Sequence, residues 1–180
     1  MDEKQLKQKQ VDMHKNFFDD CNCAIENGFY LEAIFLEYAA IESRLEIMCG
    51  LLALPCNKDL PANVRKDIAI SHRIECIKRV RNKNSEIFKR SKLDKGFFKD
   101  NGVLAEWIKT RNMFIHGLYK NAGDYKARKR KFEELAIKGE KLARALYNEV
   151  SRLRRLLKSH PELFVDLACP KKSVCFEKKK

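Results

Sequence analysis

Three polar side chains lie within one short apolar stretch, KTRNMFIHGLYK, which covers residues 109–120. They are Arg111, Asn112 and His116. A guanidinium is a permanent cation that binds phosphate through parallel hydrogen bonds, and a histidine exchanges protons near neutral pH. Residues of these types suit acid–base chemistry on a phosphate, but they also occur as the polar edge of an ordinary helix. Their position on the helix is the first test between the two interpretations.

The stretch has helical spacing, and Arg111 falls inside its apolar face. Counted at roughly 100° per residue, one sector holds Leu104, Trp107, Ile108, Phe114 and Ile115. Arg111 lies within this sector, while Asn112 and His116 are i, i+4 neighbours at its border. An arginine on an apolar face is costly unless another group pairs with it. The pattern therefore predicts a partner for Arg111.

The helix expected at 29–54 contains an acidic residue that suits this role. On the same wheel Glu42 lies on the apolar side, whereas Glu37 and Arg44 are expected to face away. A carboxylate and a guanidinium on facing apolar stripes satisfy one another, so we expect Glu42 to pair with Arg111. A purely structural alternative remains, in which this pair is a buried brace and His116 bonds a carbonyl near Gly117.

Composition narrows the class of protein. The chain has 180 residues, 44% hydrophobic, with only 7 glycines and 4 prolines, which favours a single helical domain over a sheet-rich one. The net charge is +13, and residues 121–180 alone hold 17 basic and 8 acidic groups. Such a field attracts polyanions, of which nucleic acid is the commonest, although a solubilising surplus of charge is the alternative.

The cysteines and hydropathy indicate a reduced, cytoplasmic protein. Seven cysteines are scattered without paired Cys-x-x-Cys spacing, so structural zinc is not expected. No apolar run approaches the roughly 20 residues of a membrane span, and the first residues lack the apolar centre of a signal peptide. We expect no metal, no cofactor and no membrane partner.

Hydrophobic periodicity predicts an all-α bundle of four to five helices. Helices are expected at 11–28, 29–54 and 63–80, then from near Asn101, and last from the loop at 121–131 to His160-Pro161. Gly28 and Pro55 are the expected stops of the first two. Residues 81–96 are expected to connect helices through a short helical turn, and an apolar patch at 163–167 is expected to dock on the body. The predicted organisation is a charged N-terminus at 1–11, a domain at 12–160 and a tail at 161–180.

Two stretches resemble the HEPN family. RNMFIH, residues 111–116, resembles its Arg-x4-6-His signature, in which a polar residue commonly follows the arginine. YLEAIFLEYAAIESRLEIMCGLLAL, residues 30–54, is similar to the long second helix of small HEPN proteins, with a glutamate embedded in it. The resemblance covers about residues 12–158 and implies an HEPN-like helical bundle. Family members are metal-independent ribonucleases, often toxins or antiviral defence effectors, or inactive binding modules.

The resemblance implies a specific chemistry. In active members two protomers pair so that both motifs line one cleft, and RNA is cut by its own 2′-hydroxyl. His116 is then expected to transfer a proton, Arg111 to hold the phosphate and Asn112 to position either group. Glu42, as the counter-charge of Arg111, completes the expected catalytic set. A homodimer and an RNA substrate follow, and a toxin would have a cognate antitoxin or regulatory protein.

Basic residues near the motif are expected to guide the RNA backbone. The predicted RNA-binding residues are Lys109, Tyr119, Lys120, Lys126, Arg128, Lys129, Arg130 and Lys131. The run at 126–131 is equally typical of a solvated helix start. Two other functions stay open: a non-catalytic helical module that binds RNA or protein, and a regulatory protein of the mannitol-repressor kind. Both would bind a partner without cutting RNA.

Overall fold

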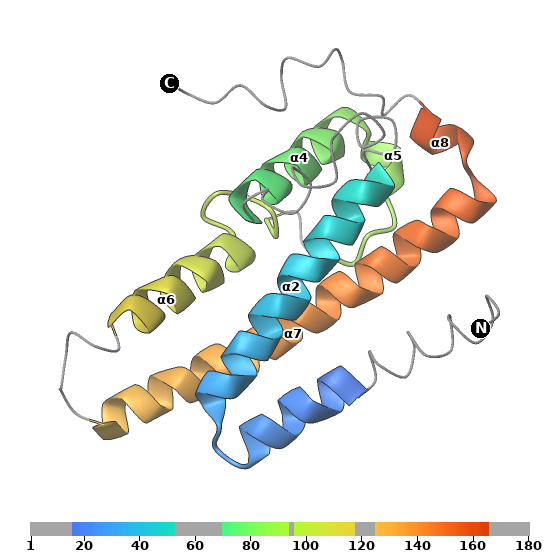
Figure 1. Cartoon of the computed structure of the whole chain (residues 1–180). Helices are drawn as coiled ribbons and strands as arrows, with labels where there is room; N and C mark the ends of the chain where they lie inside the picture. The colour runs from blue at the N-terminus through green and yellow to red at the C-terminus, as the bar shows by residue number, and fades with distance from the viewer. Residues whose placement is uncertain (1–15, 53–69, 94–95, 118–124, 166–180) are drawn as a thin grey trace, which may run out of the picture. The chain divides into compact units, whose positions relative to one another are not determined.

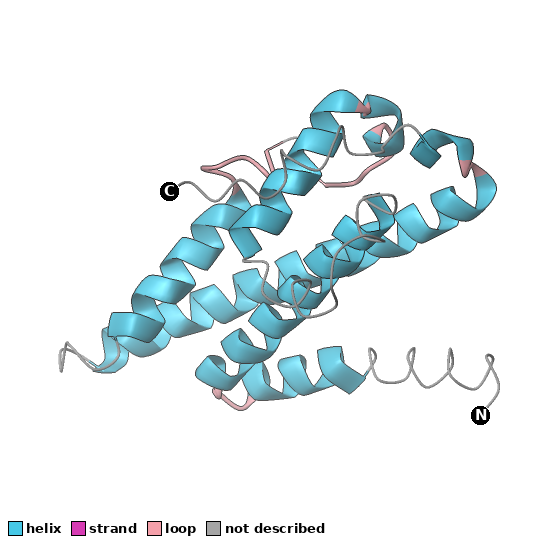
Figure 2. Ribbon diagram, turned by 45° about the horizontal axis from the view of Figure 1, so that its top comes forward, coloured by secondary structure: helices cyan, strands magenta, loops and turns pink. Residues whose placement is uncertain are grey.

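The structure, a computed structural model, describes residues 16–52, 70–93, 96–117 and 125–165. In these ranges helices are the only regular elements, so the predicted all-α class is confirmed (Figures 1 and 2). They are a helical segment at 16–26, followed by α2 (Tyr30–Leu52), α4 (Ile70–Lys83), α5 (Ser85–Phe88), α6 (Val103–Gly117), α7 (Tyr125–Ser159) and α8 (Glu162–Val165). None of these helices combines the length and apolar character that crossing a membrane requires.

The chain forms two compact units that share its long helices. The first unit comprises Met1–Ile41 and Trp107–Arg144, and the second comprises Glu42–Glu106 and Ala145–Lys180. Helices α2, α6 and α7 each contribute one part to each unit. The predicted boundary at residue 11 and most of the predicted tail lie outside the described residues.

Gly28 ends the first described helix, as predicted. Its φ of 77° is a left-handed conformation that glycine adopts without a steric cost. The amide of Gly28 donates to the Ile25 carbonyl at 3.1 Å, and the amide of Phe29 donates to the Ala24 carbonyl at 2.8 Å. These two bonds form a Schellman motif, which satisfies the last carbonyls of the helix and lets α2 begin two residues later.

The apolar stripes predicted for α2 and α7 are buried. In α2 the fully or nearly fully buried members are Ile34, Ile41, Leu45, Met48 and Leu52. In α7 they are Leu135, Leu142, Leu146, Val150 and Leu153, and the helix ends at Ser159, before His160 and Pro161 as predicted. Each unit therefore draws its core from segments far apart in the sequence, which fixes the helices that bear the polar residues.

The connecting segment and the tail also follow the prediction where they are described. The expected short helical turn is α5, and both Ile87 and Phe88 within it are buried. The apolar patch after Pro161 begins as α8, in which Phe164 is buried. Asn84, just before α5, donates through Nδ2 to the Leu163 carbonyl at 3.2 Å, which ties α8 to the α4–α5 corner of the second unit.

Candidate functional site

Arg111 of α6 lies against aromatic rings of α2, within the first unit. Its guanidinium carbon is 4.1 Å from the centroid of the Tyr38 ring and 5.3 Å from that of Phe35. These two rings are one turn apart on α2, so they form a continuous surface for the flat guanidinium. Stacking of this kind stabilises a cation by about 0.5–2 kcal/mol without neutralising it. The rings therefore offset the steric and solvation cost of placing Arg111 on this face, and the guanidinium keeps its charge.

The hydrogen bonds of Arg111 leave part of it unused. Nη1 donates to Oδ1 of Asn112 at 2.9 Å, and Nε is buried without a hydrogen-bond partner in the described residues. Within the described part of its own unit, Arg111 forms no ion pair. A bound anion that reaches the outer nitrogens of the guanidinium would gain charge-assisted hydrogen bonds, whereas the buried Nε is closed to solvent. The site is a positioned cation that no carboxylate among the described residues of its own unit compensates.

Asn112 and His116 complete the motif on the same helix. The Arg111 bond uses the carbonyl oxygen of Asn112, so the amide nitrogen of Asn112 keeps two donors for another group. His116 is exposed in the last turn of α6, one turn beyond Asn112. Between them Met113 is 63% exposed, and Phe35, under Arg111, is 46% exposed. Two large apolar side chains near the motif, one on each helix, are thus open to solvent in the single chain.

Glu42, the predicted counter-charge of Arg111, is bonded to a different arginine. In the second unit, Nη1 of Arg73 lies 3.4 Å from the Glu42 carboxylate, and its Nη2 lies 3.7 Å from Glu46. The Arg73 side chain is 5% exposed, whereas that of Glu42 is 43% exposed. These contacts form an ionic brace between α2 and α4. An ion pair of Glu42 was expected, but its partner is Arg73 and not Arg111. Because its carboxylate serves Arg73, we do not retain Glu42 as a catalytic residue.

The prediction that Glu37 and Arg44 face away from the core was wrong. Glu37 is fully buried and Arg44 is 5% exposed, with its guanidinium carbon 5.2 Å from the centroid of the Tyr147 ring. The buried sector of α2 extends beyond the apolar stripe and includes these residues and Ala33. An amphipathic stripe identifies the centre of a buried face, but it does not show how far round the helix the neighbours reach.

Glu37 lies in a small buried acidic cluster of the first unit. A Cβ added at Gly139 of α7 would overlap its carboxyl group and would lie 2.7 Å from Cζ2 of Trp107. Neither carboxyl oxygen has a hydrogen-bond partner of good geometry among the described residues. Burial, and secondarily the charge of Glu140, raise the pKa of Glu37 to about 9, although the Glu140 backbone amide favours the charged form. Glu37 is therefore a neutral acid near neutral pH, which the helical spacing of α2 did not indicate.

Cys21 is part of the same buried region. Burial first, and then the charges of Glu37 and Glu140, raise the pKa of its thiol to about 12. A thiol in this environment stays protonated and is a poor nucleophile or metal ligand. Among the described residues, no three His, Cys, Asp or Glu side chains are grouped so that they could hold a metal ion.

Of the predicted RNA-binding residues, two line an aromatic pocket of the first unit. Arg128 and Lys129 border a pocket of about 410 Å³ that also includes Phe29, Tyr30 and Phe132. Nη2 of Arg128 is buried without a hydrogen-bond partner among the described residues. Aromatic rings with unpaired cations suit nucleic acid, because bases stack on the rings while phosphates pair with the cations. The aromatic members were not anticipated from the sequence.

The remaining predicted residues are dispersed or undescribed. Lys109 and Lys131 are exposed, and Arg130 is paired with Glu134 at 3.3 Å, an ordinary pair along one helix. Tyr119, Lys120 and the side chain of Lys126 lie outside the described residues. The run at 126–131 therefore includes both an ion-paired surface and two pocket-lining cations.

Phe132 links this pocket to α6. Its ring centroid lies 5.5 Å from that of Phe114, which is on the same side of α6 as Arg111.

No protein-family model, curated protein or solved structure matched this chain in the comparisons. The resemblance to HEPN proteins consequently remains a prediction that rests on the motif and on the residues around it.

Proposed function

We propose that the protein is a metal-independent endoribonuclease of the HEPN type, acting as a homodimer. The observation that supports this proposal is the state of Arg111, which is held on two rings and by Asn112 and has no carboxylate partner within the described part of its unit. A structural brace would use the charge of the arginine. A phosphate-binding arginine must keep it, and preorganised cations of this kind stabilise charge that develops in a transition state.

The reaction assigns one role to each residue of the motif. The 2′-hydroxyl of the substrate loses its proton and attacks the adjacent phosphorus, and the bond to the 5′-oxygen of the next nucleotide breaks. His116 transfers a proton in this exchange, and the products are a 2′,3′-cyclic phosphate and a 5′-hydroxyl end. Arg111 holds the non-bridging oxygens, and the amide nitrogen of Asn112 orients the phosphate.

An apolar surface around the motif supports the dimeric arrangement. Met113 of α6 and Phe35 of α2 are both exposed in the single chain, and large exposed apolar side chains often mark an interface. In a two-fold dimer that buries them, the two copies of Arg111 and His116 approach one cleft. Exposed His116 would then be brought into a partly dry site by the partner rather than by its own chain.

The test is cleavage of RNA by purified protein in excess EDTA. We expect Arg111→Ala and His116→Ala each to lower the rate by at least about 100-fold, because each removes a group that acts in the transition state. Arg144→Ala is the matched control, since Arg144 also lies over a ring, 4.6 Å from the Phe18 centroid, but is bonded to Glu140 at 2.7 Å.

Two further readouts make the outcome decisive. The products should carry a cyclic phosphate, and Met113→Glu should give a monomer by sedimentation that no longer cuts RNA. Cleavage that survives equally in both motif variants would refute the proposal. Intact RNA together with salt-sensitive RNA binding would instead favour a non-catalytic binding module, and binding of a protein partner alone would favour a regulatory one. If the protein cuts RNA, a cognate antitoxin should prevent that cleavage.

A further inference from the structure

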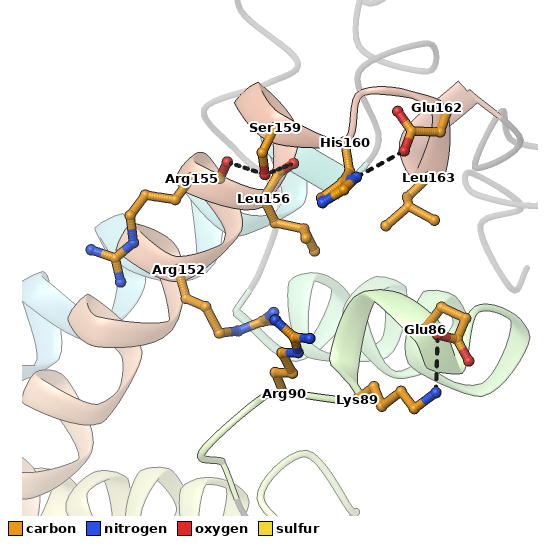
Figure 3. A pocket seen from close by; sticks show the side chains of 10 residues that line it. All are labelled: Glu86, Lys89, Arg90, Arg152, Arg155, Leu156, Ser159, His160, Glu162 and Leu163. Atoms are coloured by element: carbon orange, nitrogen blue, oxygen red, sulfur yellow. Dashed lines mark hydrogen bonds and ion pairs between the residues drawn. The ribbon is translucent and has the colours of Figure 1, made fainter.

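A second pocket lies wholly within the second unit. None of the residues that line it belongs to the motif of the proposed reaction. It has a volume of about 670 Å³ and is formed by α5, the turn after it, the end of α7 and α8 (Figure 3). Its size is within the range of roughly 300–1,000 Å³ that is usual for small-molecule sites. Its lining combines charged side chains with two leucines.

One side of the pocket carries two guanidinium groups. In Figure 3, Arg152 of α7 and Arg90 of the turn after α5 direct their guanidinium groups toward the same part of the pocket. Arg152 is fixed by Glu149, with Nε and Nη2 donating to the two carboxylate oxygens at 3.0 and 2.7 Å. Because Glu149 is only 3% exposed, this bidentate pair holds Arg152 in one orientation.

Arg90 supplies the charge that remains uncompensated. It is exposed and forms no ion pair with any described residue, whereas its neighbour Lys89 is paired with Glu86 at 3.5 Å. The bond to Glu149 uses Nε and Nη2 of Arg152 and leaves Nη1, so an anion between Nη1 and the Arg90 guanidinium would gain charge-assisted hydrogen bonds. The planar donors of arginine match the oxygens of a phosphate.

The other side of the pocket is apolar and has one imidazole. Leu156 and Leu163 point into the pocket from α7 and α8, and His160 lies above them (Figure 3). Nδ1 of His160 is bonded to Glu162 at 3.0 Å, which orients the ring. A ligand that fits both sides needs an anionic group at one end and a flat, largely apolar part at the other.

We propose that this pocket binds a nucleotide. The phosphate lies between Arg90 and Arg152, and the base covers Leu156 and Leu163 beside the His160 ring. The ligand is either a free mononucleotide or the phosphorylated end of an RNA strand, since both present the same chemistry. This site does not depend on the proposed ribonuclease activity, because it uses no residue of the α6 motif.

The first experiment is calorimetric titration of the full chain with adenosine 5′-monophosphate, adenosine and inorganic phosphate. We expect the nucleotide to bind at least about tenfold more tightly than either fragment, because only the nucleotide uses both sides of the pocket. Arg90→Glu should weaken nucleotide binding by about tenfold or more, since it replaces a charge-assisted donor with a like charge. Lys92→Glu, the same change of charge on an exposed side chain that is not in the pocket, should leave binding unaltered.

A second titration distinguishes the two sources of nucleotide. It uses a short DNA strand, which cannot be cut through a 2′-hydroxyl, with and without a 5′-phosphate. Tighter binding of the phosphorylated strand than of the mononucleotide identifies a strand end as the ligand, and the reverse order identifies a free nucleotide. No heat with the mononucleotide, equal affinity for inorganic phosphate, or equal weakening by Lys92→Glu would each overturn the proposal. Circular dichroism confirms that the variants are folded.

Discussion

Replacement of Glu37 by glutamine is expected to lower the stability of the protein at acidic pH, and to leave it equal or higher at alkaline pH, relative to the wild type. Glu37 is fully buried, has no hydrogen-bond partner of good geometry among the described residues, and has a pKa of about 9. The folded protein therefore holds a proton on this carboxyl that the unfolded chain releases near its ordinary value of 4.5. Glutamine has almost the same shape but carries no titratable proton in either state.

The size of the effect follows from proton linkage. Between the unfolded pKa near 4.5 and the folded pKa near 9, the folded state binds one more proton at this group than the unfolded state. The free energy of unfolding consequently falls by about 1.4 kcal/mol per pH unit, which is the opposite of the usual behaviour of an ion-paired carboxylate. From about pH 5 to about pH 8 this loss is about 4 kcal/mol for the wild type and zero for the glutamine at this position.

The glutamine has a cost of its own that does not depend on pH. Its two amide donors are buried without described acceptors, which destabilises the fold by about 1–3 kcal/mol. We therefore expect Glu37→Gln to be less stable than the wild type near pH 5 and equally or more stable near pH 8. The expected result is that the two curves of unfolding free energy against pH, for the wild type and for Glu37→Gln, cross. Their absolute values are not part of the prediction.

Urea unfolding of both proteins at about four pH values measures this crossing. The difference between the two curves removes the contribution of every other titrating group, because those groups are common to both. Glu134→Gln is the control, since Glu134 is exposed on α7 and its curve should run parallel to that of the wild type. Parallel curves for Glu37→Gln and the wild type would refute the reasoning, because they would mean that Glu37 is charged in the folded state.

Two changes around the same cluster should also destabilise the first unit. Gly139→Ala is expected to cost about 1–3 kcal/mol, because its Cβ would meet the Glu37 carboxyl and the Trp107 ring, whereas Gly117→Ala, with nothing within 4 Å, should cost nothing in the same urea titration. Trp107→Phe should cost about 1–3 kcal/mol, since the indole nitrogen donates to the Leu135 carbonyl at 2.8 Å and the carbonyl would lose this partner. Circular dichroism follows the unfolding of that variant, because Trp107 is the only tryptophan.

The helices could be predicted from the sequence because their signals are local. Gly28 terminates a helix through its own backbone conformation, and the stripes of α2 and α7 repeat with helical spacing over many turns. The short helix α5 was also predicted, since it depends on a few neighbouring residues. Such features survive any arrangement of the helices, so the hydrophobic pattern is sufficient to find them.

The partners of the charged side chains could not be predicted in the same way. Arg73 is polar by type and lies in a basic segment, yet it is buried with Glu42 and Glu46. Glu37 is buried because Gly139 leaves room for a carboxyl against α7, and no pattern within α2 records that glycine. These pairings depend on which residue of a distant helix lies opposite, and a wheel drawn for one helix does not contain that information.

The environment of Arg111 shows why the missed rings matter for function. An arginine on an apolar face was expected to need a carboxylate, and Glu42 was its predicted partner. Tyr38 and Phe35 offer a different solution, in which a flat cation is accommodated by flat rings and keeps its charge. A carboxylate partner would neutralise the cation and take up some of its donors, whereas an aromatic partner lies on the face of the guanidinium and leaves its charge and its donors to a phosphate. This difference is what makes binding of an anion at Arg111 compatible with the same packing that holds the helix, and it is the reason that a ribonuclease is favoured over a brace.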